Sequence, residues 1–144
     1  MYRTRRGGLE VLLVHPGGPF WAKKDAGAWF IPKGEVNPGE DQLVAARHEF
    51  QEETSLKPDG HFLPLGTVKN KSGKMIVAWA FQGDCDPDAI QSNTFSMEWP
   101  PKSGKQRDFP EVDRAAFFTI EQAKEMIHPA EAELLTRLER ISSS

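Results

Sequence analysis

The sequence predicts a single α+β domain, and three observations lead to this class. The chain has 144 residues, which is about the length of one domain. Its composition, 38% hydrophobic and 27% charged, is that of an ordinary globular protein. Short runs of branched apolar residues cluster between the helical patterns instead of alternating with them, which favours α+β over a parallel doubly wound sheet. A chain of this size can bury a core without a disulfide or a structural metal.

The first half of the chain is expected to form two strands, a helix and a hairpin. Residues 9–14 (LEVLLV) are branched and apolar and end at a Pro-Gly-Gly turn, and residues 28–32 form a second, shorter run. Apolar spacing of three and four then predicts a helix over 41–54. Residues 62–69 and 74–81 flank an Asn-Lys-Ser-Gly cluster, which predicts an antiparallel hairpin.

The second half is expected to begin with loops and to end with helices. Residues 83–91 and 100–110 are rich in Pro, Gly, Asp and Lys and are interpreted as loops around a short strand at 94–99. A last strand at 115–118 leads into a capping box, Thr-Ile-Glu-Gln, which opens a helix ending near residue 127. A final helix is expected from Pro129, with Leu134, Leu135 and Leu138 on its apolar face.

Charge and cysteine content exclude several classes of protein. The balance of 18 basic and 21 acidic residues, a net charge of −3, lacks the basic surface of a protein that coats nucleic acid. The single cysteine, Cys85, has no partner for an internal disulfide and is expected to be inert. No apolar run approaches the ~18 residues of a membrane span, and the N-terminus lacks a signal-peptide pattern. We therefore expect a cytoplasmic protein.

Three carboxylates share one face of the helix predicted over 41–54. Glu49, Glu52 and Glu53 stand at positions i, i+3 and i+4, within side-chain reach of one another. Like charges at this spacing disfavour ionisation unless a cation lies among them, and clustered oxygens suit Mg²⁺ or Mn²⁺. A solvated helix face is the alternative, but the Gly- and Pro-punctuated loop just before the helix favours a metal or anion site.

At this point the segment resembles the Nudix box, G-x5-E-x7-R-E-U-x-E-E-x-G-U, in which U is a bulky aliphatic residue. The residues in register are Gly34, Glu40, Glu49, Glu52, Glu53 and Leu56, with the aromatic Phe50 at the first U position. The resemblance implies an α/β/α sandwich with a mixed central sheet over residues 1–144. Two positions depart from the pattern, because His48 replaces the arginine and Ser55 replaces the second glycine.

These departures have physical consequences. His48 is shorter than the family's arginine and has no bidentate fork, so it is expected to hold the box carboxylates less firmly. Arg47 points about 100° away on a helix and is a poor substitute. A left-handed Ser55 would cost on the order of 1 kcal/mol of stability. In addition, only eight basic-rich residues precede the first strand, and an exposed sheet edge there would favour a homodimer.

The resemblance also implies the roles of individual residues. It implies a Mg²⁺- or Mn²⁺-dependent hydrolase of a nucleoside diphosphate linked to another group. Glu49 and Glu53 match the metal ligands, Glu52 a further ligand or water-orienting group, and the Lys33 carbonyl completes the shell. Glu40 braces the loop against the helix, and Gly34, His48 and Ser55 are structural positions of the motif.

A catalytic base from outside the box is also implied. Glu111, in Phe-Pro-Glu-Val, occupies the place where many relatives carry a loop glutamate, so Glu52, Glu53 and Glu111 form the expected catalytic set. Glu98 is the rival. Glu111 is preferred because a loop can close over the substrate.

The segment Trp-Phe-Ile-Pro-Lys-Gly at 29–34 is similar to the corresponding segment of diadenosine polyphosphate hydrolases. The expected substrate contacts are Lys33, Gly34, Arg6, Lys24 and Trp99. His15, His61 and His128 show no ligand spacing and are expected to be structural or exposed.

Three functions remain open. The leading hypothesis is a dinucleoside polyphosphate pyrophosphohydrolase, and the second is a nucleoside triphosphate pyrophosphohydrolase that clears oxidised nucleotides. The third is a Nudix-fold nucleotide-binding module with weakened catalysis, which His48 and Ser55 would permit and the intact box glutamates oppose. In each case the expected partner is a nucleotide-type small molecule.

Overall fold

The strands of the first and last parts of the chain pair into one sheet. The computed structural model describes residues 1–6, 8–32, 39, 41–70 and 72–142. Strands β1 (Tyr2–Arg5), β2 (Gly8–Pro16) and β7 (Val112–Thr119) form an antiparallel sheet in the order β1-β2-β7. The run predicted at 9–14 is thus the centre of this sheet, and four consecutive residues of it, 11–14, are buried.

The predicted hairpin forms a two-stranded sheet of its own, and the chain just after it contacts β1. Strands β3 (Leu63–Lys69) and β4 (Met75–Ala80) pair with each other as expected. Just beyond β4, the Phe81 carbonyl accepts a 3.0 Å hydrogen bond from the Tyr2 amide, and the Gly83 amide donates to the Tyr2 carbonyl at 2.9 Å. This contact is an isolated parallel bridge between antiparallel sheets, and the α+β class is confirmed.

Strand β1, which the sequence did not predict, forms one edge of the β1-β2-β7 sheet. It pairs with β2 on one side and contacts the segment after β4 on the other. Its basic residues are also engaged, because Arg3 and Arg5 contact the Asp84 carboxylate at 2.6 and 2.5 Å. A homodimer stays a prediction.

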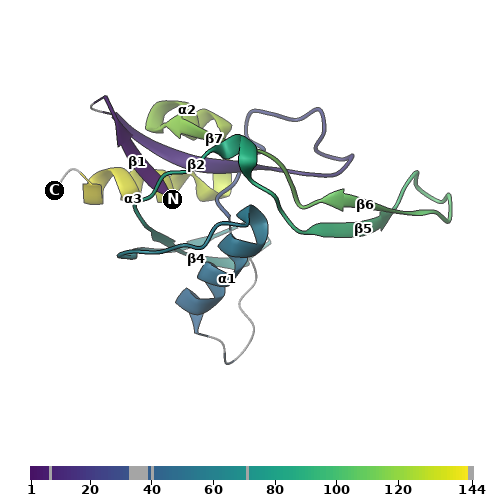
Figure 1. Cartoon of the computed structure of the whole chain (residues 1–144), viewed down its shortest axis with the longest axis horizontal. Helices are drawn as coiled ribbons and strands as arrows, with labels where there is room; N and C mark the ends of the chain where they lie inside the picture. Colours follow the sequence, from purple (N-terminus) through teal and green to yellow (C-terminus); the bar gives the residue numbers. More distant parts are fainter. Residues whose placement is uncertain (7, 33–38, 40, 71, 143–144) are drawn as a thin grey trace.

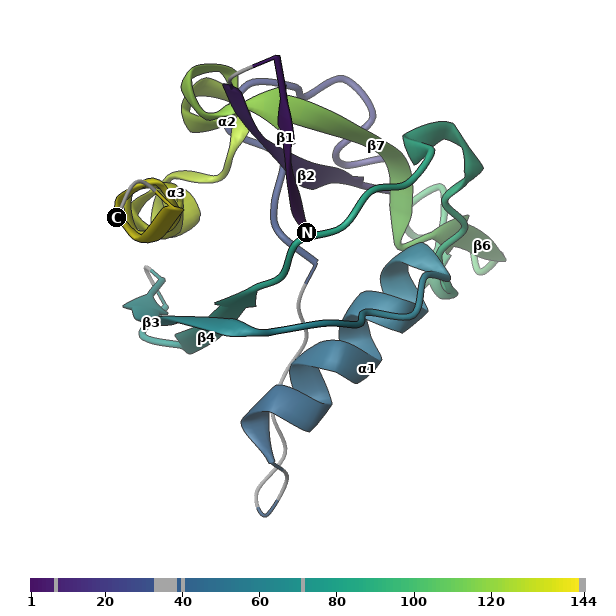
Figure 2. The ribbon, with the colours of Figure 1, turned by 60° about the vertical axis from the view of Figure 1, so that its left-hand side comes forward.

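The helices begin where the capping residues predict. Asp41 accepts a 3.0 Å bond from the Val44 amide at the start of α1 (Gln42–Thr54). The capping box of Thr119 opens α2 (Ile120–Met126). The last predicted helix starts at Pro129 with a 3-10 turn and continues as α3 (Ala132–Ser142). Figure 2 shows α1 running beside β4, with α2 and α3 on the side of the β1-β2-β7 sheet.

The loop predicted over 100–110 is wrong in its second half. Residues Gln106–Pro110 form β6, which pairs with β5 (Thr94–Glu98) in a hairpin that projects from the body of the molecule (Figure 1). Its sequence, QRDFP, is polar and contains proline, so it lacks the alternation that marks a half-buried strand. Conversely, the strand predicted at 28–32 is reduced to isolated bridges at Trp29 and Phe30.

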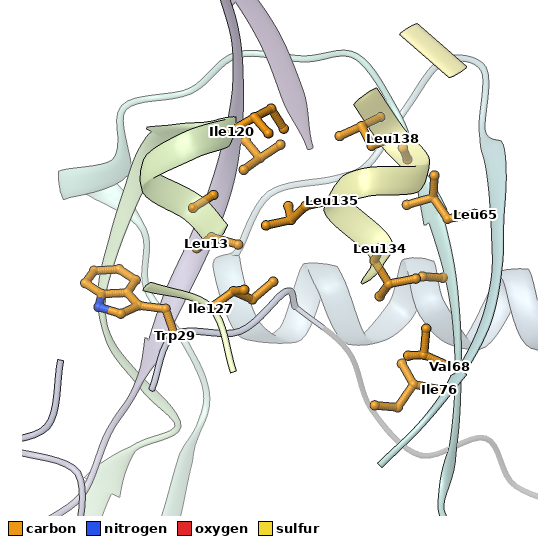
Figure 3. Close-up of a cluster of buried hydrophobic side chains, with 14 residues drawn as sticks. Leu13, Trp29, Leu65, Val68, Ile76, Ile120, Ile127, Leu134, Leu135 and Leu138 are labelled. Carbon is orange, nitrogen blue, oxygen red and sulfur yellow. The ribbon is translucent and has the colours of Figure 1, made fainter. Parts of the chain in front are cut away.

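The main core lies between the β1-β2-β7 sheet, the β3–β4 hairpin and the C-terminal helices. Leu134, Leu135 and Leu138 of α3 are buried, which confirms the predicted apolar face. Figure 3 shows them facing Leu13 and Ile127 on one side and side chains of β3 and β4 on the other. Within the described part of the chain, no helix is long and apolar enough to cross a membrane.

Candidate functional site

Glu111 is held against the end of α1 by a series of backbone hydrogen bonds. It lies between β6 and β7, and its amide donates to the Asn93 carbonyl at 2.8 Å. The Asn93 amide in turn donates to the Glu52 carbonyl at 3.1 Å. On its other side, the Glu111 carbonyl accepts a 2.9 Å bond from the Gly17 amide. The chain therefore places Glu111 next to the last turn of α1.

The electrostatics agree with this placement. Partial burial raises the pKa of the Glu111 carboxyl above its usual range, and the negative charge of Glu52 raises it further. Two carboxylates that disturb each other in this way are stabilised by a cation between them. Glu98 lies elsewhere, exposed at the far end of β5, about 14 Å along the strand from Thr94. The structure thus brings Glu111, and not Glu98, to the predicted helix.

The three glutamates of α1 differ in exposure. Glu53 is buried, with 6% of its surface exposed, while Glu49 and Glu52 are half-buried. Among the residues that the structure describes, no group of three or more His, Cys, Asp or Glu side chains is gathered closely enough to hold a metal ion. The donor set nevertheless fits a hard divalent cation, because it consists of carboxylate oxygens and includes the mutually repelling pair Glu52 and Glu111.

His48 contacts this carboxylate set at Glu52. Its Nε2 lies 2.8 Å from Oε1 of Glu52, one helical turn further along α1. The neighbouring Arg47 points elsewhere, with its guanidinium 5.1 Å from the centre of the Phe62 ring. One imidazole nitrogen therefore stands where the family pattern has a forked guanidinium, which can bind a carboxylate at two points.

Ser55 ends α1 in the left-handed conformation that the pattern assigns to glycine. Its φ is 64° and its ψ is 12°, and its amide donates to the Gln51 carbonyl at 2.7 Å. The Ser55 hydroxyl donates to the Gln91 carbonyl, which ties the end of the helix to the segment that contains Asn93. Ser55 thus has a strained backbone conformation, and its hydroxyl binds the segment of Gln91 and Asn93 that positions Glu111.

Several expected substrate contacts lie on or near the projecting hairpin. Trp99 follows β5 and packs edge-on against Phe20, with 5.7 Å between the ring centres. Lys24 lies in the neighbouring loop, 17–27, with its Nζ 5.0 Å from the centre of the exposed Trp21 ring. Arg6, by contrast, lies in the β1–β2 turn, at the opposite end of β2 from Gly17 and Glu111. At about 3.4 Å per residue, β2 separates them by roughly 27 Å.

The predicted contributions of Lys33, Gly34 and Glu40 lie outside the described residues. Cys85 is half-buried, and burial together with Asp84 raises the pKa of its thiol, which agrees with the inert role expected for it. Asn93 is a residue that sequence reasoning missed. Its contribution is made by its backbone, so no residue-type pattern could have identified it.

A cavity of about 720 Å³ lies on another face of α1. Its walls come from α1, the β3–β4 hairpin, β2 and α3, and include Phe50, Trp79 and Leu135. Neither Glu52 nor Glu111 lines it. The lining residues include Arg47 and Lys74 but no Asp, Glu, His or Cys, so the cavity and the carboxylates of α1 lie at different places on the described part of the chain.

Comparison with known proteins agrees with this fold. The model of the Nudix domain matches residues 1–138. The crystal structure of a C. elegans Ap4A hydrolase binary complex has a TM-score of 0.68 and 21% sequence identity, covering 99% of this chain and 93% of that one. This similarity concerns the fold.

Two curated relatives match shorter segments. The asymmetrical bis(5'-nucleosyl)-tetraphosphatase of Rattus norvegicus is 37% identical over 57 residues, 35% of this chain and 39% of that protein. An RNA pyrophosphohydrolase of Erythrobacter litoralis is 47% identical over 36 residues, 25% of this chain and 22% of that protein. The chain thus aligns with less than half the length of either relative. Because the family model extends over nearly the whole sequence, the chain belongs to the Nudix hydrolase family.

Proposed function

We propose that this protein is a divalent-metal-dependent pyrophosphohydrolase that cleaves a phosphoanhydride bond in nucleoside diphosphate-linked compounds, with dinucleoside polyphosphates as preferred substrates. The observation that carries the proposal is the position of Glu111 beside Glu52, which adds a fourth carboxylate to the three of α1. Nudix hydrolases generally use divalent metal ions. Mg²⁺ or Mn²⁺ is the proposed cofactor, because both ions favour carboxylate oxygens.

The residues divide the chemistry between them. Glu49, Glu52 and Glu53, with the Lys33 carbonyl, are the proposed metal-binding groups. The bound ion would neutralise phosphate charge and acidify a water molecule. Glu111 is the proposed general base, because its raised pKa makes it a better proton acceptor than an ordinary carboxylate. Glu52 and Glu53 complete the catalytic set, and Gly34, Glu40, His48 and Ser55 maintain the motif.

Support for the substrate class comes from two sources. The segment 29–34 is similar to that of diadenosine polyphosphate hydrolases, and the rat relative is named a bis(5'-nucleosyl)-tetraphosphatase. We propose Lys33 and Gly34 as contacts to the phosphates near the metal, and Lys24 and Trp99 as contacts to the far end of the substrate. The position of Arg6, at the far end of β2, leaves it as the weakest of the proposed contacts.

A substrate panel tests the proposal. Diadenosine tetra- and hexaphosphate, dGTP, oxidised dGTP, ADP-ribose and capped RNA are each incubated with the protein in Mg²⁺, in Mn²⁺ and in EDTA. The highest kcat/KM is expected for a diadenosine polyphosphate, with no turnover in EDTA. A preference for oxidised dGTP would instead establish the nucleotide-clearing function.

No turnover with any substrate would favour the binding module. In that case the variant His48→Arg shows whether the departure from the family pattern is the cause. Turnover that appears only in this variant would identify a catalytically weakened member of the family.

Glu111→Gln and Glu98→Gln form a matched pair that tests the proposed base. Each variant replaces one carboxyl by a neutral amide of the same shape, so differences in kcat report the charge and the proton acceptor. Glu111→Gln is expected to lower kcat by about 10²–10⁴-fold, the usual contribution of a general base, while Glu98→Gln leaves it unchanged. The reverse result would transfer the role to Glu98.

A further inference from the structure

A fully buried histidine lies at the end of β2, next to the loop that begins beside Glu111. His15 has 0% of its surface exposed. Its Nε2 lies 2.6 Å from the Lys24 carbonyl, and because a carbonyl only accepts, Nε2 carries a proton and donates it. Its Nδ1 lies 2.7 Å from Oδ1 of Asp113. The ring is thus held at both nitrogens, one by loop 17–27 and one by β7.

The partner strand is irregular at this point. His15 pairs with Arg114 and Pro16 pairs with Val112, so Asp113 is an extra residue in β7. A bulge of this kind bends a strand and redirects a side chain, and here the redirected side chain is the one that meets His15. Glu111 is two residues before the bulge. The bulge therefore lies just where the chain passes from Glu111 into β7.

Loop 17–27 is packed equally closely against the residues around Glu111. The Gly17 amide donates to the Glu111 carbonyl at 2.9 Å. A Cβ atom added to Gly17 would lie 1.9 Å from the Pro110 carbonyl oxygen, so the two backbones touch at a point that admits only glycine. The far part of the loop is the part that His15 holds, through the Lys24 carbonyl.

From this geometry we propose that His15 is a positioning residue for Glu111. Its ring connects loop 17–27, through the Lys24 carbonyl, to the bulge of β7, through Asp113. The same loop binds the Glu111 carbonyl through the Gly17 amide, so this connection holds the Glu111 backbone in place. The inference rests on the proposed function, in which Glu111 is the general base. Loop 17–27 also has an attachment of its own, the 2.7 Å bond from Trp29 Nε1 to Asp25, so loss of His15 is expected to shift the loop without unfolding it.

The first test removes the two bonds of His15 together and then restores one. His15→Leu lacks both bonds, whereas in His15→Asn the amide nitrogen lies near the former Nδ1 and can still donate to Asp113. His15→Leu is expected to lower kcat by about 10–100-fold with little change in KM, the effect of a misplaced catalytic group. His15→Asn is expected to recover part of the loss. An unchanged kcat in His15→Leu would overturn the proposal.

A matched control separates positioning from stability. Val11 is also buried in β2 but pairs with Phe118, toward the other end of the strand. Val11→Ala is expected to lower Tm while kcat, measured well below Tm, stays at the wild-type value. If Val11→Ala lowers kcat as much as His15→Leu does at equal loss of Tm, the effect is one of general stability and the proposal fails.

A double-mutant cycle asks whether His15 acts through Glu111. In the Glu111→Gln background, His15→Leu is expected to cause no further loss of kcat, because the group that it positions is already gone. Full additivity of the two losses would overturn the proposal. Where His15→Leu fails to fold, Asp113→Ala takes its place in both tests, since the Asp113 side chain is 31% exposed and its removal leaves no large void.

A third readout is independent of turnover. Amide hydrogen exchange at Gly17 reports the bond to the Glu111 carbonyl, and it is expected to be faster in His15→Leu than in wild type and unchanged in Val11→Ala. Unchanged protection of Gly17 in His15→Leu would overturn the positioning role of His15 even if the wild type hydrolyses none of the panel. Faster exchange together with an inactive wild type would support this role and contradict only the proposed function.

Discussion

The carboxyl of Glu111 illustrates how a site can disfavour its own charge before a ligand arrives. Burial and the neighbouring Glu52 both make the ionised form less favourable than in water, so the folded protein binds a proton there more tightly than the unfolded chain does. The penalty is absent when the group is protonated in both states. It grows as the pH rises from the ordinary carboxyl pKa through the raised one, and it persists at neutral pH.

The metal-free protein should therefore be stabilised by neutralising this residue. Glu111→Gln is expected to have a higher Tm than wild type at pH 7 and an equal Tm well below pH 4.5, the ordinary pKa of the group. Thermal unfolding in EDTA across this pH range measures the difference. Glu98→Gln, which changes an exposed carboxyl on β5, serves as the control. An increase in Tm of Glu111→Gln over wild type that is the same at both pH values would show that the charge of Glu111 is not the cause.

At the scale of single elements, the end of α1 shows a compromise between backbone strain and a side-chain bond. Glycine adopts the left-handed conformation at no steric cost, whereas a serine there costs roughly 1 kcal/mol. In return, the Ser55 hydroxyl binds the Gln91 carbonyl and connects α1 to the segment beside Glu111. The glycine of the family pattern avoids the strain at this position, whereas Ser55 of this chain accepts the strain and gains the hydrogen bond to Gln91.

Two substitutions separate these contributions. Ser55→Ala keeps the strained φ of 64° and loses the hydroxyl, so its free energy of unfolding is expected to fall below that of wild type. Ser55→Gly also loses the bond but relieves the strain, so it should exceed Ser55→Ala by roughly 1 kcal/mol. Urea unfolding of the three proteins measures both differences. Equal stability of the glycine and alanine variants would show that the conformation carries no strain.

At the scale of the whole molecule, the sequence predicted the elements whose formation depends on neighbouring residues. Helix α1 and the capping box of α2 followed from spacing and capping residues, and the buried strand β2 followed from its branched apolar run. The roles of Asn93 and His15 could not be predicted in this way, because each depends on a residue far along the chain. The strand β6 was missed for a related reason, since its pairing with β5 outweighs a polar composition.

The proposed metal site also makes a prediction for the whole molecule. An ion that binds only the folded state stabilises it by about 2.7 kcal/mol at 100 times its Kd. Mn²⁺ or Mg²⁺ is therefore expected to raise Tm in wild type and to do so less in Glu49→Gln. The control is Glu133→Gln, which alters an exposed carboxylate on α3. If the ions raise Tm equally in all three proteins at matched ionic strength, the helix carboxylates are not the binding site.

The pairing of β2 with β7 has a consequence for how the chain is made. Glu10 lies opposite Thr119, so β2 stays without this antiparallel partner until the chain has been synthesised through Thr119. Until then the edge of β2 that pairs with β7 is open to solvent and to other nascent chains. The basic residues Arg3 and Arg5 in β1, which later meet Asp84, place positive charge on the strand that pairs with the other edge of β2.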